Sequence, residues 1–459
     1  MPPGKRRFPL RVSSEYIVCM RFHGARLHEK EREVGKGSIM SATNGVKVVV
    51  TGFGAITPLG NDVASTWEAL RSGRSGAAPI TKFDASNFPV RFAAEVKGFD
   101  PSLYMDKKLV RRFDSYMHFA YAAAAEAMQS AGLDKEKIAN LGADRCGMLI
   151  GSGIGGMQAH FEEADAYVKG GYKKVSPFFI PAMIPNMASG MLAIEYGFQG
   201  LNFAVCSACA TSNHAIFSAL RFLRAGDADL ILCGGTEVGV NIMSLAGFIA
   251  EKALSTRNDA PEKASRPFDK ERDGFVLGEG AALLVLETES FAKKRGAKIL
   301  AEIAGAGASC DAHHMTAPCP DGSGAARAMR AALKDAGISP TEVDYVNAHG
   351  TSTPLGDRGE VQAVKSVLGD HAYAIKMNST KSMTGHLLGT AGGLEAIVCI
   401  QTILNSYIHP TINLENPDEG LDLDFVPNVG KECAVHTALS NSFGFGGHNS
   451  SIAIRKYPA

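Results

Sequence analysis

The sequence has no excess of charge of either sign, no long apolar run and no paired-cysteine framework. Its 459 residues contain 47 Lys or Arg and 47 Asp or Glu, so the formal net charge is zero. Nothing in that balance indicates a nucleic acid or an anionic lipid surface as a partner. No apolar run approaches the roughly 18–20 residues that a membrane-spanning helix needs. We therefore expect a protein that binds neither nucleic acid nor a membrane.

Cysteine is present, but not in a pattern that indicates disulfide bonds. The nine cysteines are an odd number, and several lie in apolar runs such as 230–233. That distribution favours buried, reduced thiols and a cytoplasmic location. Cys206 and Cys209 form a Cys-x-x-Cys pair, but no second such pair completes a zinc site. The glycine-rich loop 151–156 lacks a following acidic residue to hold a ribose, so we expect neither a metal nor a cofactor.

Residues 1–39 differ from the rest of the chain in charge. They carry nine Lys or Arg against four Glu, a net charge of +5, and they lack the apolar core of a secretory signal. Two explanations stay open. The segment is either a transit peptide, which would imply import into an organelle, or a disordered extension before a natural start at Met40. We set residues 1–45 apart as a basic extension and exclude them from the fold.

Strand-like and helix-like segments alternate along the remaining chain, which is typical of the α/β class. Strands are expected at 46–54 and 450–454. Segments 127–133 and 332–338 resemble each other, and each has the pattern of a helix end capped by a glycine, Gly132 or Gly337. Further on, two more similar segments lead into helices expected at about 210–223 and 391–404. These pairs indicate two similar halves, 46–297 and 298–457.

Cys209 is the sharper candidate for a nucleophile. It lies where a strand-like segment changes into a helix that begins near Ala210. The free N–H groups and partial positive charge of a helix start lower the pKa of a nearby thiol. Cys206, three residues earlier, is interpreted as a packed strand residue.

Two histidines lie in segments of the kind that α/β folds use for function. His349 follows a strand-like run and precedes a glycine and several hydroxyl residues. His386 precedes a helix rich in small residues. Taken from the residues alone, either one can also be a structural histidine, in a turn or in the core. Lys381 and Glu395 are expected to form a buried ion pair, and the alternating Gly and Phe of 441–447 predict a mobile loop.

Together, five segments resemble the β-ketoacyl-(acyl carrier protein) synthase family, in its elongating type II branch. These segments are 207–212, 266–275, 347–357, 379–389 and 441–447, and the resemblance covers roughly 46–456. It implies the thiolase fold, in which two similar α/β halves form a layered αβαβα sandwich with two mixed sheets. It also implies a homodimer. His386 stands where initiating synthases carry Asn, and Phe445 where thiolases carry a second Cys.

The resemblance implies an acyltransferase of fatty-acid elongation. It would extend a Cys-bound acyl chain by decarboxylative Claisen condensation with malonyl-acyl carrier protein. Cys209 would take the acyl group, and the backbone N–H groups of Cys209 and Phe445 would stabilise the oxyanion. His349 and His386 would stabilise the enolate as neutral imidazoles.

Further residues take supporting roles by the same resemblance. Lys381 and Glu395 would orient the histidine pair and tune its charge. Substrate-binding positions would be Ile154 at the acyl pocket, Thr351 and Thr353 along the pantetheine channel, and Phe443, while Phe445 would gate access. The acyl carrier protein is acidic, which implies a basic docking surface. The residues that match it are Lys108, Arg111, Arg112, Lys173, Lys174 and Lys252.

Two alternatives remain beside the favoured function. A discrete polyketide ketosynthase would use the same residues, but the resemblance to the type II fatty-acid branch is closer. A catalytically silent partner subunit is the other alternative. The presence of Cys209, His349, His386 and Lys381 argues against it.

Overall fold

The computed structural model describes residues 45–458, and these residues belong to one compact unit. Its first part contains β1 (Val48–Ile56), α1 (Val63–Arg71), β2 (Ala78–Pro79), β3 (Phe92–Ala93), α2 (Lys107–Val110), α3 (Ser115–Ser130), α4 (Lys135–Gly142), β4 (Cys146–Gly151), α5 (Met157–Gly170), α6 (Phe179–Met183), α7 (Met187–Tyr196), α8 (Thr211–Ala225), β5 (Leu230–Val238), α9 (Ile242–Ala250), β6 (Glu279–Thr288) and α10 (Glu289–Lys294). Its second part contains β7 (Ala301–Cys310), α11 (Ser323–Ala336), β8 (Tyr345–Asn347), α12 (Pro354–Leu368), β9 (Lys376–Asn378), α13 (Lys381–Thr384), α14 (Ala391–Asn405), β10 (Tyr407–Ile408), β11 (Lys431–Glu432), β12 (Thr437–Gly444) and β13 (His448–Arg455).

Nine strands form one hydrogen-bonded sheet in the order β4-β5-β6-β1-β7-β13-β12-β8-β9. Outward from the β1–β7 junction, both sides show the same series of two antiparallel pairs followed by a parallel pair. Only two residue pairs join the halves there, Val49 with Glu302 and Val50 with Ala301. The sheet therefore consists of two mixed halves that meet along a short seam.

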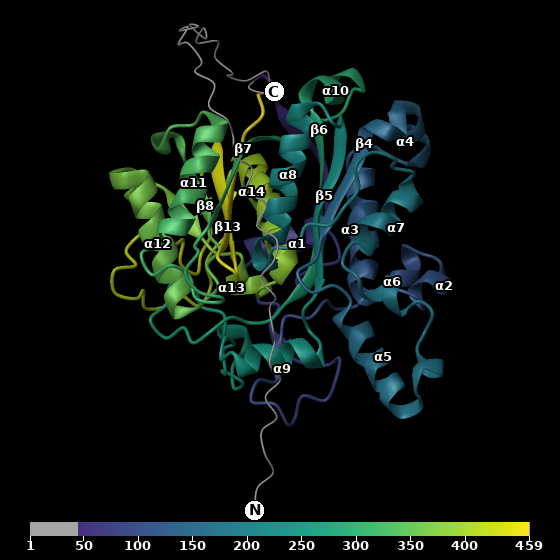
Figure 1. The fold of residues 1–459 in the computed structure, drawn as a ribbon. Coiled ribbons are helices and arrows are strands. Elements are labelled where there is room, and N and C mark those ends of the chain that lie inside the picture. The colour runs from purple at the N-terminus through teal and green to yellow at the C-terminus, as the bar shows by residue number, and fades with distance from the viewer. Residues whose placement is uncertain (1–44, 459) are drawn as a thin grey trace, which may run out of the picture. The chain divides into compact units, whose positions relative to one another are not determined.

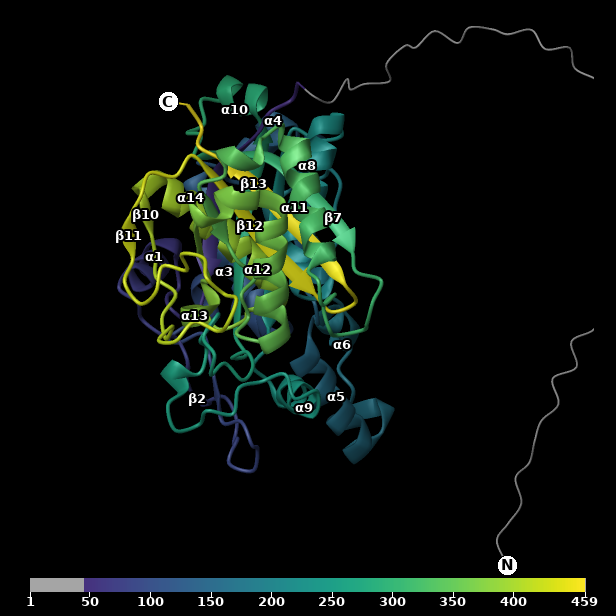
Figure 2. The ribbon, with the colours of Figure 1, turned by 90° about the vertical axis from the view of Figure 1, so that its left-hand side faces the viewer.

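Helices cover both halves of the sheet and fill the space between them. Helices α8 and α14 contact strands of both halves and form the middle layer. Helices α3 and α7 cover the outer face of the β4-β5-β6-β1 part, and α11 and α12 lie on the outer side of the other part. Figures 1 and 2 show this succession of layers. The arrangement is the layered α/β sandwich that the family resemblance implies.

The two halves repeat one arrangement of elements. Strands β1, β6, β5 and β4 correspond in order and direction to β7, β13, β12 and β8. In the second half, β9 pairs in parallel with β8. In the first half the same place beside β4 is taken by Asn202, through a single parallel bridge to Met148. The repeat puts the starts of α8 and α14 at equivalent ends of the middle layer.

Buried apolar strands explain why these segments form the centre of the fold. Strands β4, β5 and β6 are buried along their whole length, which is typical of sheets covered on both faces. The stretch Leu388–Asn405, which includes α14, has the length and composition of a membrane span, but 83% of it is buried inside the protein. We therefore assign α14 as a core helix.

Several sequence-based boundaries are confirmed. Strands β1 and β13 begin and end near the predicted positions, and α8 and α14 match the two predicted helices within two residues. Gly132, two residues after the end of α3, and Gly337, directly after α11, adopt positive φ angles of 66° and 64°. The predicted basic extension, apart from Gly45, lies outside the described residues.

Candidate active site

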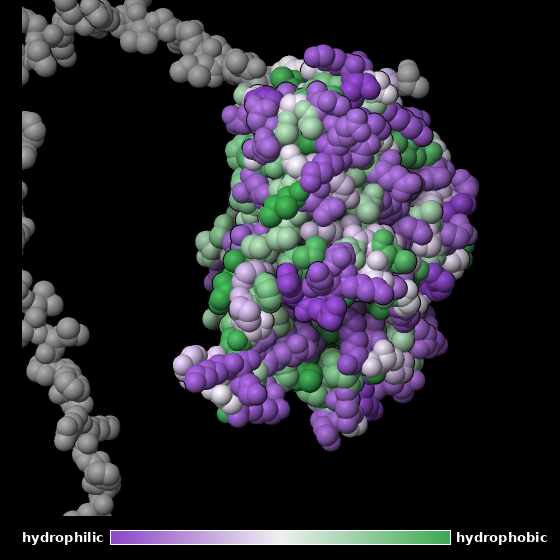
Figure 3. Space-filling view, turned by 90° about the vertical axis from the view of Figure 1, so that its right-hand side faces the viewer, coloured by the Kyte–Doolittle hydropathy of each residue, from purple (hydrophilic) through white to green (hydrophobic). Residues whose placement is uncertain are grey.

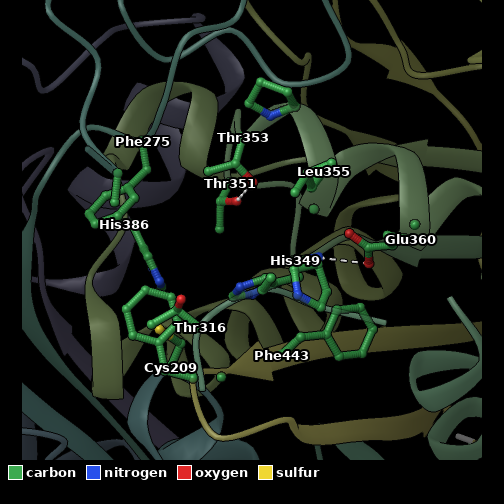
Figure 4. Close-up of a pocket in the computed structure, with 18 of the residues that line it drawn as sticks. Cys209, Phe275, Thr316, His349, Thr351, Thr353, Leu355, Glu360, His386 and Phe443 are labelled. Atoms are coloured by element: carbon green, nitrogen blue, oxygen red, sulfur yellow. Dashed lines mark hydrogen bonds between the residues drawn. The ribbon is translucent and has the colours of Figure 1, made fainter. Parts of the chain in front are cut away.

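A cavity of about 430 Å³ opens where the two halves meet. Cys209, His349 and His386 line it together with both phenylalanines of the Gly-Phe loop, Phe443 and Phe445. Figure 4 shows the two imidazoles reaching toward Cys209 from different elements. Segments separated by more than 200 residues are thus brought to one space, as the resemblance implies.

Cys209 lies in a sharp turn that leads into the middle-layer helix α8. It belongs to a short 3-10 turn, Ala208–Ala210, directly before α8. Ala208 has a φ of 50°, a left-handed conformation that is strained for a residue with a side chain. The Ser442 hydroxyl donates a 2.8 Å hydrogen bond to the Cys209 carbonyl and ties the turn to β12. A side chain at Gly444 would come within 2.7 Å of the Ser207 carbonyl oxygen, so only glycine fits there.

The expectation that the helix start lowers the Cys209 pKa is wrong in its net direction. Burial raises the pKa of the Cys209 thiol to about 12. Lys381 lowers it, as do the backbone N–H groups of Cys209 and Phe445, but burial dominates. The thiol is therefore protonated at neutral pH before substrate binds.

His349 is held by a buried carboxylate from helix α12. It follows β8, and its backbone N–H donates to Glu360 at 2.9 Å, as does the N–H of Gly350. The Asn441 side-chain amide donates to the same carboxylate at 3.1 Å. Burial raises the pKa of Glu360 to about 7, against the effect of these hydrogen bonds. Glu360 therefore fixes the backbone that carries His349.

His386 lies after α13 in a segment that pairs with the chain near β6. Its N–H donates to the Val276 carbonyl at 2.8 Å, and its carbonyl accepts from the Gly278 N–H at 2.9 Å. The ring packs edge-on against Phe275, with centroids 5.3 Å apart. The His349 and His386 rings are also 5.3 Å apart and nearly perpendicular.

Burial keeps both imidazoles neutral. It lowers the pKa of His349 well below its ordinary value, and the nearby Lys381 and His386 lower it further. Burial and Lys381 do the same for the pKa of His386. Among the described residues, the Nδ1 atom of neither ring has a hydrogen-bond partner. Each neutral ring retains one N–H donor for a ligand in the cavity.

Lys381 and Glu395 form the predicted buried ion pair. The Lys381 Nζ donates to Glu395 Oε1, and each side chain is only 2% exposed. Burial raises the pKa of Glu395 to about 7, although Lys381 opposes this shift. Removing one member would leave a buried charge without its partner, which is strongly destabilising.

The remaining predicted channel residues divide into two groups. Thr351 and Thr353 line the cavity, and their hydroxyl oxygens are 3.0 Å apart. The Phe443 ring packs edge-on against the His349 ring, and the ring centroids of Phe445 and Phe248 are 6.5 Å apart. Ile154 is not among the residues that line this cavity. It packs instead against the apolar cluster that contains Cys209 and Leu388.

Cys206 is exposed, so its assignment as a packed strand residue is wrong. The segment around it runs beside β4 at the edge of the sheet, where no described strand covers its outer side. The Cys206 Sγ lies 3.6 Å from the Gly153 carbonyl oxygen.

All six basic residues predicted for docking are exposed. Lys108 lies in α2, and Arg111 and Arg112 follow directly. The Arg112 guanidinium lies 4.4 Å from the Phe178 ring, which links this group to the segment that contains Lys173 and Lys174. Lys252 is separate, after α9, where it lines the cavity. The helices near these five residues, all but Lys252, lie on the face seen in Figure 3.

Sequence reasoning missed two supports of the site. Glu360 was not singled out, although it lies three residues after Asp357 and therefore on the same face of α12. Arg272 is buried between Asp357 at 3.4 Å and Asp418 at 2.9 Å. It also donates to the Thr353 and Pro354 carbonyl oxygens, which fixes the loop after His349. The motif 266–275 contains this arginine, but nothing in its spacing indicates the partner.

Within residues 45–458, no group of three or more His, Cys, Asp or Glu side chains is arranged to hold a metal ion. The expectation of no metal and no cofactor stays a prediction.

Two family models match the chain. The Beta-ketoacyl synthase N-terminal domain matches residues 46–292, and the Beta-ketoacyl synthase C-terminal domain matches residues 300–415. The chain therefore belongs to the β-ketoacyl synthase family.

Curated relatives cover the same part of the chain. The "3-oxoacyl-[acyl-carrier-protein] synthase 2" of Coxiella burnetii is 52% identical over 410 residues, which are 89% of this chain and 98% of that protein. The chloroplastic "3-oxoacyl-[acyl-carrier-protein] synthase I" of Arabidopsis thaliana is 47% identical over 90% of this chain and 87% of its own length.

Solved structures share the fold. A β-ketoacyl synthase from Burkholderia phymatum has a TM-score of 0.83 and 34% identity, covering 90% of this chain and all of that one. A type II polyketide ketosynthase, solved in complex with its acyl carrier protein, also has a TM-score of 0.83, with 35% identity and the same coverage.

Proposed function

We propose that the chain is a 3-oxoacyl-(acyl carrier protein) synthase of the elongating type. It condenses an acyl chain with malonyl-acyl carrier protein to give the 3-ketoacyl-carrier product. The observation that carries this proposal is one buried thiol, Cys209, in the same cavity as two histidines that burial keeps neutral. Curated relatives at about half identity carry that activity in their names.

The first half-reaction transfers the acyl group to Cys209. The sulfur attacks the thioester carbonyl of the acyl-carrier, the carrier's C–S bond breaks, and the thiol proton ends on the released carrier thiol. The backbone N–H groups of Cys209 and Phe445 face the sulfur and would donate to the oxyanion of the tetrahedral intermediate. Losing one such donor typically costs ~10²–10³ in rate.

The second half-reaction uses the histidine pair. Malonyl-carrier loses CO₂, and the electrons of the broken C–C bond form an enolate on the thioester. His349 and His386 each donate an N–H to that oxygen, which requires neutral rings with a free donor. The enolate carbon then attacks the Cys209 thioester, and the released sulfur takes a proton from solvent. Burial lowers the pKa of both histidines, and Lys381, which is paired with Glu395, lowers it further, so both rings remain neutral donors.

The carrier protein is the proposed partner. Its phosphopantetheine arm would enter past Thr351 and Thr353, and its acidic surface would meet the exposed basic residues near α2 and at Lys252. One solved relative is described as a complex with its acyl carrier protein. Surface ion pairs weaken with salt, so the affinity for carrier protein should fall as ionic strength rises, and a salt-independent affinity would argue against this surface.

A homodimer is also proposed. The segment beside β4 presents an outer edge that no described strand covers, and Phe203 on it is 40% exposed. Open edges of this kind pair readily with another chain. The compartment stays a prediction, either the cytoplasm or an organelle if residues 1–39 are a transit peptide. The relatives include bacterial and chloroplastic proteins.

A polyketide ketosynthase is the second candidate. Its support is the fold shared with the polyketide ketosynthase complex at 35% identity. The curated 3-oxoacyl-carrier synthases are more similar in sequence, at 47–52% identity over a comparable share of the chain, and the first candidate is therefore preferred.

Intact-mass analysis after incubation with acyl-carrier protein tests the proposal. The wild-type chain should gain one acyl group, Cys209→Ala should gain none, and the matched control Cys206→Ala should be acylated nearly as fast as wild type. Cys206 is a fair control because it is three residues away, exposed and outside the cavity lining. Equal losses in the two variants would contradict the assignment of Cys209.

A further inference from the structure

One buried carboxylate near the cavity has no part in the mechanism above. Glu237, near the end of β5, is fully buried and accepts four hydrogen bonds. Its Oε1 accepts from the Ser152 hydroxyl at 2.6 Å and from the Ile154 N–H at 3.1 Å. Its Oε2 accepts from the Gly153 N–H at 2.7 Å and from the Gly389 N–H at 3.1 Å. Three of the four donors are backbone groups, which cannot reverse their direction.

These donors belong to two different loops, the one that carries Ile154 and the turn that follows His386. The loop after β4 carries Ile154, which packs against the cluster that contains Cys209. Gly389 lies three residues after His386, in the turn that leads into α14. The two loops also touch directly, since a side chain at Gly389 would come within 2.7 Å of the Gly153 nitrogen and 2.6 Å of the Glu237 carboxylate.

The turn after His386 needs such a support. Leu388, which lines the cavity, has a φ of 49°, a conformation that costs a branched residue free energy. Its neighbour Gly389 is held on both sides, by Glu237 at the N–H and by the Ser212 hydroxyl at the carbonyl, 2.5 Å away. Ser212 lies in the first turn of α8, three residues after Cys209.

The charge of Glu237 is balanced by hydrogen bonds alone. Among residues 45–458, no salt bridge includes Glu237. Burial raises the pKa of its carboxyl, and the four hydrogen bonds oppose that shift. Hydrogen bonds to an ionised acceptor are roughly twice as strong as those between neutral groups, so the two loops are tied most firmly while Glu237 is charged.

We infer that Glu237 is a positioning residue that anchors both the Ile154 loop and the turn after His386. One side chain thereby sets the acyl-binding side of the site and the decarboxylating side together. This inference rests on the proposed function for its consequence in catalysis, but the anchoring itself is a property of the fold. A change at Glu237 should therefore disturb both half-reactions, whereas a change on one loop away from the contact should disturb one.

Three variants separate these possibilities. Glu237→Gln keeps the shape but removes the charge, and it turns an N–H₂ group toward backbone N–H donors. Gly389→Ala places a methyl group between the two loops and Glu237. Ser152→Ala, the control, removes only the hydroxyl donor on the Ile154 side. Acylation by short-chain and long-chain acyl-carrier proteins, and CO₂ release from malonyl-carrier protein without an acyl donor, are measured separately.

We expect Glu237→Gln and Gly389→Ala to lower both long-chain acylation and CO₂ release roughly 10- to 100-fold, because several buried hydrogen bonds to a charged group weaken together. Ser152→Ala should lower long-chain acylation and leave CO₂ release within about twofold of wild type. A loss confined to one half-reaction in both Glu237→Gln and Gly389→Ala would overturn the inference, as would no loss in either.

Hydrogen exchange of the full chain supplies a readout that does not depend on activity. Glu237→Gln should raise amide exchange in both 152–156 and 387–390, and Ser152→Ala in the first segment only. Unchanged protection of 387–390 in Glu237→Gln overturns the inference even if the wild type takes no acyl group. A wild type that takes no acyl group, with both segments deprotected in Glu237→Gln, refutes the proposed function alone. If Glu237→Gln does not fold, Gly389→Ala decides by the same two criteria.

Discussion

Cys209, His349 and His386 share one environment, and burial changes the protonation of all three. It raises the pKa of the thiol and lowers that of both imidazoles, so each group is neutral at rest. The buried charges of Lys381 and Glu395 are paired with each other, whereas the Glu360 and Glu237 carboxylates are held by hydrogen bonds. New charge develops on the reacting substrate, where donors are already in place.

The histidine pair should be needed more for decarboxylation than for acyl transfer. His349→Ala and His386→Ala each remove one N–H donor from the enolate oxygen, and losing one such donor typically costs ~10²–10³ in rate. We therefore expect CO₂ release from malonyl-carrier protein to fall by at least about 100-fold. Acylation of Cys209, followed by intact mass, should fall much less.

His160→Ala is a suitable control, because His160 is exposed and lies outside the cavity lining. Its CO₂ release should equal that of the wild type. Normal decarboxylation by either His349→Ala or His386→Ala would show that the pair does not stabilise the enolate.

Glu360 should make the stability of the fold depend on pH. Its pKa is about 7 in the folded chain, raised from an ordinary value near 4.5 by burial. Between those two values the folded state binds more protons than the unfolded state, so stability falls as pH rises from about 4.5 to about 7. The contribution is at most about 3 kcal/mol over that range.

Glu360→Gln removes this titration. The variant should be less stable at every pH, since an amide accepts fewer of the N–H groups of His349, Gly350 and Asn441. Its loss of stability between pH 5 and pH 7.5 should nevertheless be smaller than that of wild type. Denaturant unfolding at fixed protein concentration measures both slopes, and parallel slopes would mean that Glu360 does not titrate in this range.

At the scale of elements, the sequence predicts where helices and strands lie along the chain better than it predicts how deeply a side chain is buried. The strands β1 and β13 follow from apolar runs, and the helices α8 and α14 from two similar segments that lead into them, which are all features of the sequence itself. The exposure of Cys206 and the raised pKa of Cys209 do not follow, because they depend on how much protein covers each thiol. Glu360 was missed for a related reason, since two of its three hydrogen-bond donors are backbone N–H groups, which have no sequence signature.

Ile154 provides the test at this scale, because its loop joins β4 to α5. It packs against the cluster that contains Cys209 but does not line the described cavity. A long acyl chain on Cys209 should therefore need the space beside Ile154. Ile154→Phe overfills that space at a typical cost of ~1–3 kcal/mol, which corresponds to roughly a 10- to 100-fold loss in affinity.

Acylation rates with short and long acyl-carrier proteins measure the effect. Long chains should lose one to two powers of ten, and short chains should lose little. Ile194→Phe is the matched control, because Ile194 is 67% exposed on α7, and it should lose neither. A uniform loss for all chain lengths in Ile154→Phe, with lower thermal stability, would mean that Ile154 is a packing residue of the loop and not part of the acyl pocket.

For the whole molecule, the repeat of two similar halves leaves one difference at the sheet edges. The second half ends in β9, which pairs with β8 through three residues. The first half has only the bridge between Met148 and Asn202 at the corresponding place. Its outer edge, along 202–206, is the one that a second copy of the chain would cover, and a two-fold axis there would place identical segments against each other.

Ala204→Pro tests whether that edge forms the dimer. The Leu201 carbonyl accepts from the Met148 N–H, and the Phe203 N–H donates to the Met148 carbonyl, so both groups point toward β4. Because strand residues alternate in direction, the N–H of Ala204 points away from β4. No hydrogen bond within residues 45–458 uses it. Proline removes this donor and disturbs no bond to β4, and Ala204→Ser, which keeps the donor, is the control.

Wild type and Ala204→Ser should sediment at twice the monomer mass. Ala204→Pro loses the donor on both sides of the two-fold axis, about 1 kcal/mol each, and its dimer should dissociate roughly 10- to 100-fold more readily. A wild-type monomer, or an Ala204→Pro dimer as tight as wild type, would exclude pairing through this edge.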